Sequence, residues 1–429
     1  MTVRAGILVI GDEVLEGATA DRNGPWLARR LLDRGVEVVG IAVCPDSVAA
    51  ITSELATFAR RGCELVFTSG GLGPTDDDRT VEAVARYANR PLAVDPALEE
   101  RIGAILRAAA QRWRRFDETA LRRSNRKQAL VPSGATVLDP VGTAPGLVVP
   151  PADGTGGPTV VVLPGPPREL KTLYERAVAT PVVARLLEGL EPPERRVVRF
   201  FGIPESELAR AVREIEEEIP EARALAPGTY VRKGEIELVV RYAAERAELV
   251  ERFVTALARR FPRELFAADG RTIDDLVADA LAGRSVATAE SCTGGLVAAR
   301  LTARPGASAY VRGAVVAYDN AVKEAALGVE RDLLARHGAV SREVACAMAW
   351  GAAERMGAEL AVAVTGIAGP GGGSAEKPVG TVWVATYDGR SAQAGRLWLP
   401  GDREEVRARA VTAALHALWR AARGEELPF

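Results

Sequence analysis

One group of residues that could do chemistry is the segment ESCTGG, residues 290–295. This segment follows a predicted strand and opens a predicted helix. A side chain at the start of a helix lies near unpaired backbone amides and the positive end of the helix dipole. This arrangement suits an oxyanion, so Ser291 is a candidate nucleophile. The simpler interpretation is that Ser291 only caps the helix. Cys292 is a rival nucleophile, although packing is the commoner role of an isolated cysteine.

A serine hydroxyl needs a base, and the chain has only two histidines, His337 and His416. A centre with several histidine ligands is thereby excluded, and a Ser-His-Asp triad would need one of these two to be well placed. Tyr318 and Lys323, in the segment VAYDNAVK, are candidate bases because they straddle a strand end and a helix start. A neutral lysine would need burial or a nearby cation to lower its pKa.

A glycine-rich segment at residues 365–373 follows another predicted strand. Its backbone amides could hold a phosphate. Glycines form ordinary loops equally often, so this run alone decides nothing.

A second group of reactive residues lies in the first quarter of the chain. Asp12 and Glu13 end the first predicted strand, and SGGLGPTDDDRT, residues 69–80, ends another. Ligands of open parallel sheets bind at the carboxyl ends of strands. Glycine amides there suit a diphosphate, and clustered carboxylates suit a hard divalent cation. The alternative is that residues 76–78 only cap the helix predicted to begin near Thr80.

Alternating apolar strands and amphipathic helices must position these residues. Strand-like runs at residues 3–10, 36–43 and 65–68 alternate with helix-like stretches, which predicts a parallel, doubly wound α/β sheet closing with a helix at 168–178. Residues 195–269 have the pattern of a small α+β module. The last part, with strands predicted near 310–318, 360–365, 379–387 and 395–399, indicates a second α/β sandwich. We therefore expect an α/β protein with domains at residues 1–178, 179–269 and 270–429.

Length and composition agree with several domains, because 429 residues exceed one ordinary core. The 55 basic and 57 acidic residues give a net charge of −2, which offers no general attraction to nucleic acid or an anionic membrane. No apolar stretch is long enough to span a bilayer, so we expect a cytoplasmic protein without nucleic-acid or membrane partners. Four scattered cysteines without CxxC spacing predict neither a zinc site nor a disulfide framework.

The motifs AESCTGG, GAVVAYDNAVK, HGAVS, VTGIAGPGGGS, KPVGTV and GDR stand in this order across residues 273–422. Together they resemble the C-terminal domain of CinA proteins, the nicotinamide mononucleotide amidohydrolase family. The resemblance implies Ser291 as nucleophile, Tyr318 and Lys323 as its activating partners, Thr365 in the site and Arg403 as a phosphate ligand. It implies nicotinate mononucleotide and ammonia as products, with no cofactor. The further substrate-binding candidates are Glu290, Thr293, Gly294, Gly295, Gly366 and Gly369.

The motifs GDEVLEGATADRN, TSGGLGPTDDDRT, GTAPG and LPGPPREL resemble the molybdopterin-binding-like domain of CinA across residues 3–175. This resemblance implies hydrolysis of ADP-ribose to AMP and ribose 5-phosphate with a divalent metal, Mg, Mn or Co. The implied metal candidates are Asp12, Glu13, Asp77 and Asp78, and the implied substrate-binding candidates are Asn23, Gly71, Gly73, Thr75, Gly165, Pro166 and Glu169.

Other functions remain open at this point. Related folds bind or adenylate molybdopterin with a similar glycine and acidic loop. The middle module resembles the KH-type linker of full-length CinA, yet it lacks a GxxG loop, and we assign it no RNA binding. The chain could also be a non-catalytic partner in competence or DNA repair, but its balanced charge offers no basic face for that role. The resemblance further implies a homodimer.

Overall fold

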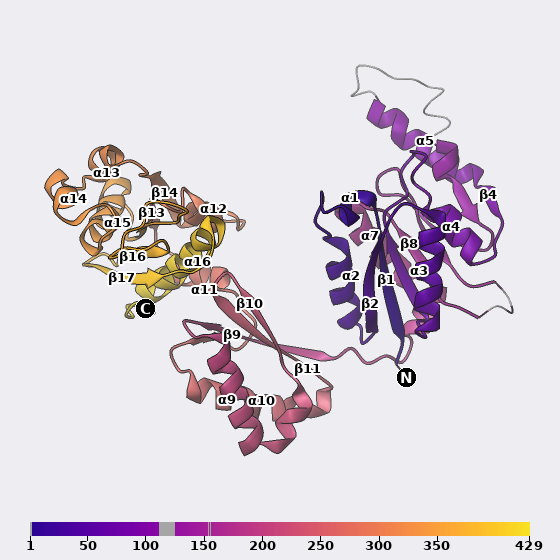
Figure 1. Cartoon of the computed structure of the whole chain (residues 1–429), viewed down its shortest axis with the longest axis horizontal. Coiled ribbons are helices and arrows are strands. Elements are labelled where there is room, and N and C mark those ends of the chain that lie inside the picture. The colour runs from indigo at the N-terminus through magenta and orange to yellow at the C-terminus, as the bar shows by residue number, and fades with distance from the viewer. Residues whose placement is uncertain (1, 111–124, 153, 155) are drawn as a thin grey trace. The chain divides into compact units, whose positions relative to one another are not determined.

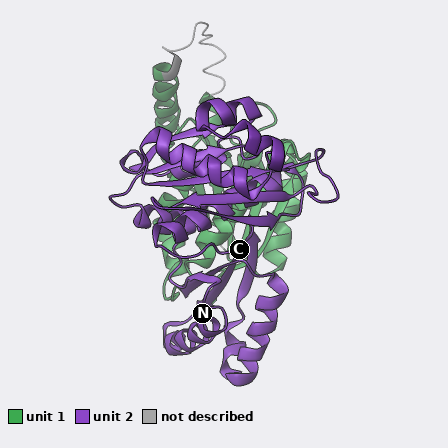
Figure 2. Cartoon of the chain, turned by 90° about the vertical axis from the view of Figure 1, so that its left-hand side faces the viewer, with its two compact units in different colours: residues 1–193 green, residues 194–429 purple. Residues whose placement is uncertain are grey.

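The computed structural model describes residues 2–110, 125–152, 154 and 156–429 and divides the chain into two compact units (Figure 1). The N-terminal unit comprises residues 1–193 and the C-terminal unit residues 194–429 (Figure 2). The N-terminal unit continues past residue 178, because helix α8 (Pro181–Leu187) packs its buried Val183 on the same core. The division into three domains stays a prediction from the sequence.

The N-terminal unit is built on a sheet in the order β2-β1-β3-β8-β7-β6. Strands β2, β1, β3 and β8 are parallel, as the alternation of strands and helices predicts. Their carboxyl ends therefore meet at one edge, where the glycine and acidic loops follow. The strands are β1 (Arg4–Ile10), β2 (Glu37–Cys44), β3 (Leu65–Ser69), β6 (Thr136–Leu138), β7 (Gly146–Val149) and β8 (Thr159–Leu163).

Strands β6 and β7 depart from the expected all-parallel sheet, since β6 pairs antiparallel with β7, and β7 antiparallel with β8. The physical reason is the connection. A parallel pair needs a crossover of a dozen or more residues, whereas only residues 150–158 join β7 to β8. As a result, the residues just before β7 lie at the same edge as the end of β8, beside the loops of the parallel strands.

Helices cover both faces of this sheet. Alternate residues of β1 enter different cores: Ile7 packs on the side of α2 and α7, and Leu8 packs on the side of α3 and α4. Because β2, β1, β3 and β8 are parallel, the helix that follows each of these strands begins on the side of the sheet that carries the loops. The helices are α1 (Asp12–Leu15), α2 (Asn23–Leu32), α3 (Val48–Arg60), α4 (Thr80–Tyr87), α5 (Pro96–Ala110) and α7 (Pro167–Val178), and a small pair of strands adds β4 (Leu92–Val94) and β5 (Leu130–Pro132). Helix α5 is predicted to reach residue 113, which lies outside the described residues.

The C-terminal unit begins with an antiparallel sheet in the order β10-β11-β9-β12, on which helices α9 and α10 pack around a core that includes Phe200 and Phe253. This agrees with the small α+β module expected for residues 195–269. Its elements are β9 (Glu194–Phe201), α9 (Glu205–Glu218), β10 (Gly228–Arg232), β11 (Glu235–Tyr242), α10 (Ala247–Arg260) and β12 (Leu265–Ala267).

The larger sheet of the C-terminal unit has the order β14-β13-β15-β16-β17, with β14, β13 and β15 parallel and the last two strands antiparallel. Helices lie on both faces. Its elements are α11 (Ile273–Ala280), β13 (Val286–Glu290), α12 (Leu296–Thr302), β14 (Val311–Val316), α13 (Asn320–Leu327), α14 (Arg331–His337), α15 (Arg342–Met356), β15 (Leu360–Gly366), β16 (Thr381–Tyr387), β17 (Ala392–Trp398) and α16 (Arg403–Ala422).

Side-chain size differs between the two faces of this sheet. Valines such as Val362 and Val364 point into the core shared with α16. Alanines such as Ala361 and Ala363 point into the core shared with α15. Small side chains let a helix approach the sheet closely, so α15 packs against the alanines of β13 and β15.

His416 joins the two sheets of the C-terminal unit. It lies on α16, is 1 % exposed, and its Nε2 is 2.8 Å from Oε1 of Glu235 at the start of β11. Its ring stacks on Phe201 of β9 with the ring centres 3.9 Å apart and meets the edge of Phe266 of β12. The small sheet and α16 therefore share one packed junction.

Among the helices that the structure describes, none combines the length and the apolar character needed to span a membrane.

Candidate active sites

Ser291 lies at the carboxyl end of β13, half-buried, and its backbone amide donates to the Val364 carbonyl of β15 at 2.9 Å. The expectation that Ser291 lies at the start of a helix needs correction. Residues 292–295 form a turn in which Gly294 and Gly295 have φ of 60° and 93°, and α12 begins only at Leu296. Ser291 thus extends the strand ladder, and the glycines turn the chain into the helix.

Glu290, expected to contact substrate, has another task. Its fully buried carboxylate accepts hydrogen bonds from the amides of Gly295, Val297 and Ala298, at 2.8–3.0 Å. A carboxylate satisfies these otherwise unpaired amides and the positive end of α12. The first amides of α12 are therefore occupied and do not serve an oxyanion. Within the described residues, the turn amides of Cys292 and Thr293 donate to no backbone carbonyl, so they are the remaining backbone donors next to Ser291.

Lys323, on α13, is 1 % exposed, the opposite of a solvated surface lysine. Its Nζ donates to the carbonyls of Ala317 at 2.8 Å and Tyr318 at 3.1 Å. The Ala317 amide in turn donates to the Glu290 carbonyl, which brings the amine next to the turn that begins at Ser291. Burial lowers the pKa of Lys323, while the charges of Asp319 and Cys292 act in the opposite direction. A neutral amine that donates both of its protons to carbonyls keeps its lone pair for accepting a proton.

Cys292 points into the core rather than toward solvent. Its side chain belongs to the cluster between the sheet and α16, and it is 5 % exposed. Burial raises the pKa of its thiol to about 12. Because the thiolate is the reactive form of cysteine, a thiol in this environment is a poor nucleophile. The geometry favours Ser291 over Cys292.

Arg403, at the first turn of α16, connects two of the predicted motifs. Its guanidinium donates to the Gly369 carbonyl at 2.7 Å and to the Tyr318 hydroxyl at 2.6 Å. Both Arg403 and Tyr318 are exposed, so a ligand can reach them. The structure thus brings the strand-end loop of β14, the glycine-rich loop and the start of α16 together.

Arg407, one turn further along α16, was not predicted. Its guanidinium donates to the carbonyls of Cys292 at 3.1 Å and Thr293 at 3.0 Å, which holds the turn after Ser291 in place. The available signal was its spacing, since residues four apart on a helix share one face and Arg403 was already a candidate.

Thr365 was expected in the reaction, but its hydroxyl is committed elsewhere. It is fully buried and donates to the Ala339 carbonyl at 2.8 Å, which fixes the loop before α15. Thr293 is also fully buried, and within the described residues its hydroxyl has no hydrogen-bond partner. Gly366 is required for packing, because a Cβ atom there would lie 2.8 Å from the Thr381 carbonyl oxygen. Thr293, Thr365 and Gly366 therefore support the site through packing and hydrogen bonds beneath its surface.

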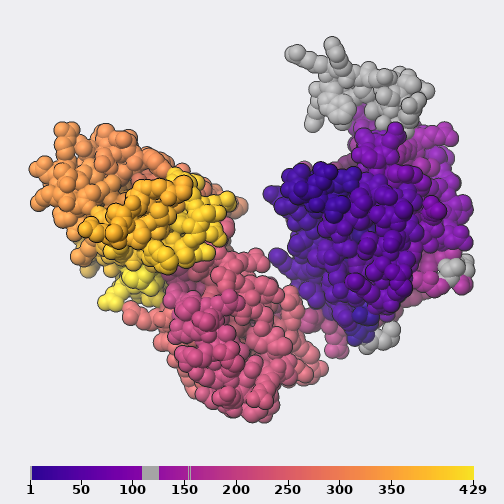
Figure 3. Space-filling view, in the orientation of Figure 1, coloured from indigo at the N-terminus to yellow at the C-terminus, as the bar shows by residue number. Residues whose placement is uncertain are grey.

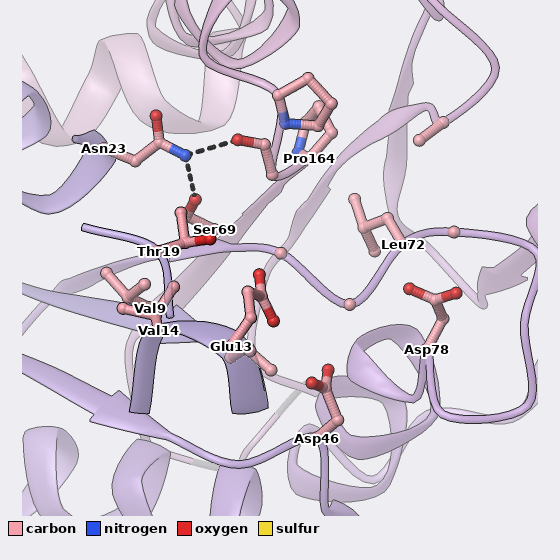
Figure 4. A pocket seen from close by; sticks show the side chains of 18 of the residues that line it. Val9, Glu13, Val14, Thr19, Asn23, Asp46, Ser69, Leu72, Asp78 and Pro164 are labelled. Carbon is pink, nitrogen blue, oxygen red and sulfur yellow. Dashed lines mark hydrogen bonds between the residues drawn. The ribbon is translucent and has the colours of Figure 1, made fainter. Parts of the chain in front are cut away.

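The N-terminal unit contains a cavity of about 770 Å³ at the edge where the parallel strands end, which we call the carboxylate cavity (Figure 4). Most residues predicted from the motifs line it. They are Glu13, Asn23, Gly71, Gly73, Asp77, Asp78, Gly165, Pro166 and Glu169. Asp12 and Thr75 do not line it. Asp12 is exposed in the short helix α1. Figure 3 shows the surface of the first part of the chain in indigo.

Asn23 ties three strand-end loops of this cavity together. It is 8 % exposed, and its Nδ2 donates to the Ser69 hydroxyl at 2.9 Å and the Gly165 carbonyl at 2.7 Å (Figure 4). Its Oδ1 is buried and has no hydrogen-bond partner among the described residues. Because the Asn23 amide is bonded on its nitrogen side, its main task is to hold the walls of the cavity.

Two glycines allow the chain to pass close to acidic side chains. Gly71 has φ of 65°, a left-handed conformation that glycine adopts without strain. At Gly73, a Cβ atom would lie 2.5 Å from Oδ2 of Asp78. The same carboxylate oxygen accepts from the amide and hydroxyl of Thr75, at 2.9 and 2.5 Å. Thr75 therefore positions Asp78 instead of facing the cavity.

Asp46 is the acidic residue of this cavity that the motifs did not reveal. It follows β2, lines the cavity with Glu13 and Asp78, and accepts from the Asp12 amide at 3.1 Å (Figure 4). Burial raises the pKa of Asp46; the Asp12 amide counters this, and the charges of Asp12, Glu13 and Asp78 reinforce it. Its position directly after a parallel strand was the available signal.

The carboxylates of this cavity can bind a cation only if groups of the substrate complete its coordination. Among the described residues, no group of three or more His, Cys, Asp or Glu side chains is arranged to hold a metal ion. Mg²⁺ typically binds one or two carboxylates together with substrate phosphates. The facing carboxylates of Glu13, Asp46 and Asp78 suit such a shared cation.

Comparison with known proteins assigns a class to each part. Residues 6–185 match the model described as "Probable molybdopterin binding domain", and residues 271–422 match the "CinA C-terminal domain". The chain combines both and belongs to the CinA-like protein family. It is 51 % identical over 425 residues to a CinA-like protein of Mycolicibacterium vanbaalenii, covering 99 % of this chain and 100 % of that protein. It is 49 % identical over 420 residues to one of Mycobacterium leprae, covering 97 % of each.

Solved structures resemble parts of the chain. The competence/damage inducible protein CihA from Agrobacterium tumefaciens is 46 % identical, with a TM-score of 0.32, over 33 % of this chain and 91 % of its own. A putative molybdenum cofactor biosynthesis protein from Corynebacterium diphtheriae is 20 % identical, with a TM-score of 0.30, over 44 % of this chain and 99 % of its own.

Proposed function

We propose that the C-terminal domain hydrolyses the amide of nicotinamide mononucleotide, with Ser291 as nucleophile and Lys323 as base. The observation that carries this proposal is the buried Lys323 amine, which donates to two carbonyls beside the turn that begins at Ser291. The exposed pair of Arg403 and Tyr318 offers a cation and a hydroxyl for the substrate phosphate. No cofactor takes part in this proposal.

The proposed reaction has two halves. The Lys323 amine takes the Ser291 proton as the hydroxyl oxygen attacks the amide carbon, and the resulting ammonium gives the proton to the departing ammonia. The turn amides of Cys292 and Thr293 are the donors available to the negative oxygen of the intermediate. Water, activated by the same amine, then hydrolyses the serine ester and releases nicotinate mononucleotide.

Ammonia release from nicotinamide mononucleotide, measured in the presence of a chelator, tests this proposal. We expect metal-independent release by the wild type and losses of about 10³-fold or more in Ser291→Ala and Lys323→Met. The control is Ser308→Ala, an exposed serine outside the site, which should keep full activity. Folded wild-type protein that releases no ammonia contradicts the proposal and favours a binding role in competence or DNA repair.

We propose further that the N-terminal domain hydrolyses ADP-ribose to AMP and ribose 5-phosphate. The carboxylate cavity supports this, because it combines a glycine-rich strand-end loop with facing carboxylates. A divalent cation, when bound with the substrate, would neutralise the diphosphate, and one or two of the lining carboxylates Glu13, Asp46 and Asp78 would hold it together with the substrate phosphates. Asn23 and Thr75 keep the surrounding loops and Asp78 in position.

AMP release from ADP-ribose, measured with Mg²⁺, Mn²⁺ or Co²⁺ and then with excess chelator, tests the second proposal. Asp78→Asn and Asp46→Asn should each lower the rate at least tenfold, whereas Asp33→Asn, at the end of α2 outside the cavity, should not. The name of the matching domain model favours molybdopterin as an alternative ligand. Turnover of molybdopterin with ATP, but not of ADP-ribose with metal, would select that alternative.

A further inference from the structure

A second cavity, of about 420 Å³, lies beside the carboxylate cavity in the N-terminal unit; we call it the apolar cavity. The two cavities share the walls formed by Gly71, Leu72, Gly73, Asp78 and Gln128. The glycine-rich loop after β3 is therefore a partition between them, and Figure 4 shows Leu72 and Asp78 on this loop, opposite Asn23. A ligand that crosses the loop can occupy both cavities.

The lining of the second cavity is chemically different from that of the first. Its own walls include Val81 of α4, Leu92 of β4, Leu130 of β5 and Pro145. Small-molecule sites are typically apolar clefts of roughly 300–1,000 Å³ with a few polar groups, and this cavity falls within that range. Its composition suits a flat, uncharged ring better than a phosphate.

The cations at the edge of the apolar cavity already have hydrogen-bond partners. The Arg79 guanidinium binds both carboxylate oxygens of Glu82, at 3.0–3.1 Å. The Lys127 amine donates to the Thr75 carbonyl. A charged group of a ligand is therefore better placed in the carboxylate cavity, where a divalent cation can join it, than here.

Gln128 gives the apolar cavity one polar contact for a ring. It is 6 % exposed, and its Nε2 donates to the Leu72 carbonyl at 2.9 Å. Its carboxamide oxygen accepts no hydrogen bond from the described residues, and it is not among their fully buried unpaired atoms. An amino group on a heterocycle is a matching donor for this oxygen.

We infer that the apolar cavity is a base subsite, which holds the adenine ring of ADP-ribose while the diphosphate crosses the loop at Gly71 and Gly73 into the carboxylate cavity. The inference rests on the proposed ADP-ribose hydrolysis and adds the residues that select the base. The absence of side chains at the two glycines lets the diphosphate approach the backbone closely. In this assignment Leu92 and Leu130 contact the ring, and Gln128 accepts from its amino group.

Binding to the full-length protein tests the subsite without turnover. Calorimetric titration of AMP and of ribose 5-phosphate, each with Mn²⁺, should be compared for wild type, Leu130→Trp and Leu130→Gln. We expect both variants to weaken AMP at least tenfold, the tryptophan by filling the cavity and the glutamine by making it polar, with ribose 5-phosphate changed less than twofold. The control is Leu32→Trp, a half-buried leucine at the end of α2 that lines neither cavity.

The outcomes separate the subsite from the proposed hydrolysis. If AMP binding depends on Leu130 but ADP-ribose is not cleaved, the base subsite stands and the hydrolase proposal fails. If ADP-ribose is cleaved and both folded Leu130 variants bind AMP as the wild type does, the subsite is overturned and the hydrolase stands. Wild-type protein that does not bind AMP, or variants that weaken both ligands equally, also overturn the subsite.

Discussion

Lys323 is the residue on which the proposed deamidation most depends. Its amine is buried and hydrogen-bonded to carbonyls, not to a carboxylate, and burial lowers its pKa below the ordinary value of 10.5. A base must be deprotonated to act, so the lowered pKa increases the active fraction near neutral pH.

The dependence of the deamidation rate on pH should report the deprotonation of Lys323. We expect kcat/KM for nicotinamide mononucleotide to rise with pH and to level off once pH exceeds the lowered pKa of Lys323, below 10.5. In Lys323→Arg, the guanidinium stays protonated, so no rising limb should appear up to pH 10. A wild-type profile that is flat, or that still rises unchanged beyond pH 10.5, argues against Lys323 as the base.

Single residues differ in how well the sequence predicts their roles. The resemblance carried by the motifs implied that Ser291, Tyr318 and Arg403 belong to one site, and the Arg403 guanidinium does donate to the Tyr318 hydroxyl. The burial of Glu290 and Thr365 could not be predicted, because the partners of Glu290 lie mainly in the first turn of α12 and the partner of Thr365 lies on a distant loop. Asp46 was missed for a related reason: it is isolated in sequence and joins the other carboxylates only through the parallel pairing of β1 and β2.

At the scale of elements, long periodic segments were predicted well and short ones poorly. The strand-helix alternation placed β1, β3 and α7 to within a few residues. The three-residue strands β4, β5 and β6 were not predicted, because a period of two needs more residues to be visible. The antiparallel direction of β7 followed from its short link to β8, a constraint that the apolar pattern alone does not contain.

The contact between α13 and α15 gives a prediction at this scale. Gly351 of α15 faces the end of α13, where an added Cβ atom would overlap the Leu327 carbonyl oxygen. Gly351→Ala should therefore destabilise the C-terminal unit by about 1–3 kcal/mol, although alanine is the better helix former. Urea unfolding followed by tryptophan fluorescence measures this change in the free energy of unfolding.

Gly371→Ala is the matched control, because an added Cβ atom there meets nothing within 4 Å and the backbone is not left-handed. It should change the free energy of unfolding by no more than about 0.5 kcal/mol. If Gly351→Ala is as stable as this control, α15 has room to shift, and the close approach to α13 is not a constraint.

At the scale of the whole molecule, the junction at His416 makes the stability of the C-terminal unit depend on pH. Burial lowers the pKa of His416 from its ordinary 6.5, against the effect of Glu235, and Arg300 and Arg420 lower it further. Below pH 6.5 the unfolded chain binds a proton that the folded junction does not bind. The free energy of unfolding should therefore fall as pH decreases from 6.5 toward the lowered pKa of the folded state.

Unfolding at pH 7.5 and pH 5.5 measures this effect. His416→Gln should reduce the loss of stability between the two pH values, because glutamine does not titrate. His337→Gln is the matched control, because His337 lies on α14, outside this junction. An equal loss of stability in wild type and His416→Gln would assign the acid sensitivity to carboxylates elsewhere.

The division of the chain at residue 193 also determines when each unit can form during synthesis. Every strand of the N-terminal sheet lies between residues 4 and 163, so that unit is complete while the ribosome is still making the rest. Domains commonly fold as units in this N-to-C order. The C-terminal unit cannot be completed until the end of synthesis, because its helix α16, with Arg403, Arg407 and His416, is made last. A nascent chain can therefore carry a finished carboxylate cavity well before the turn at Ser291 receives its final contacts.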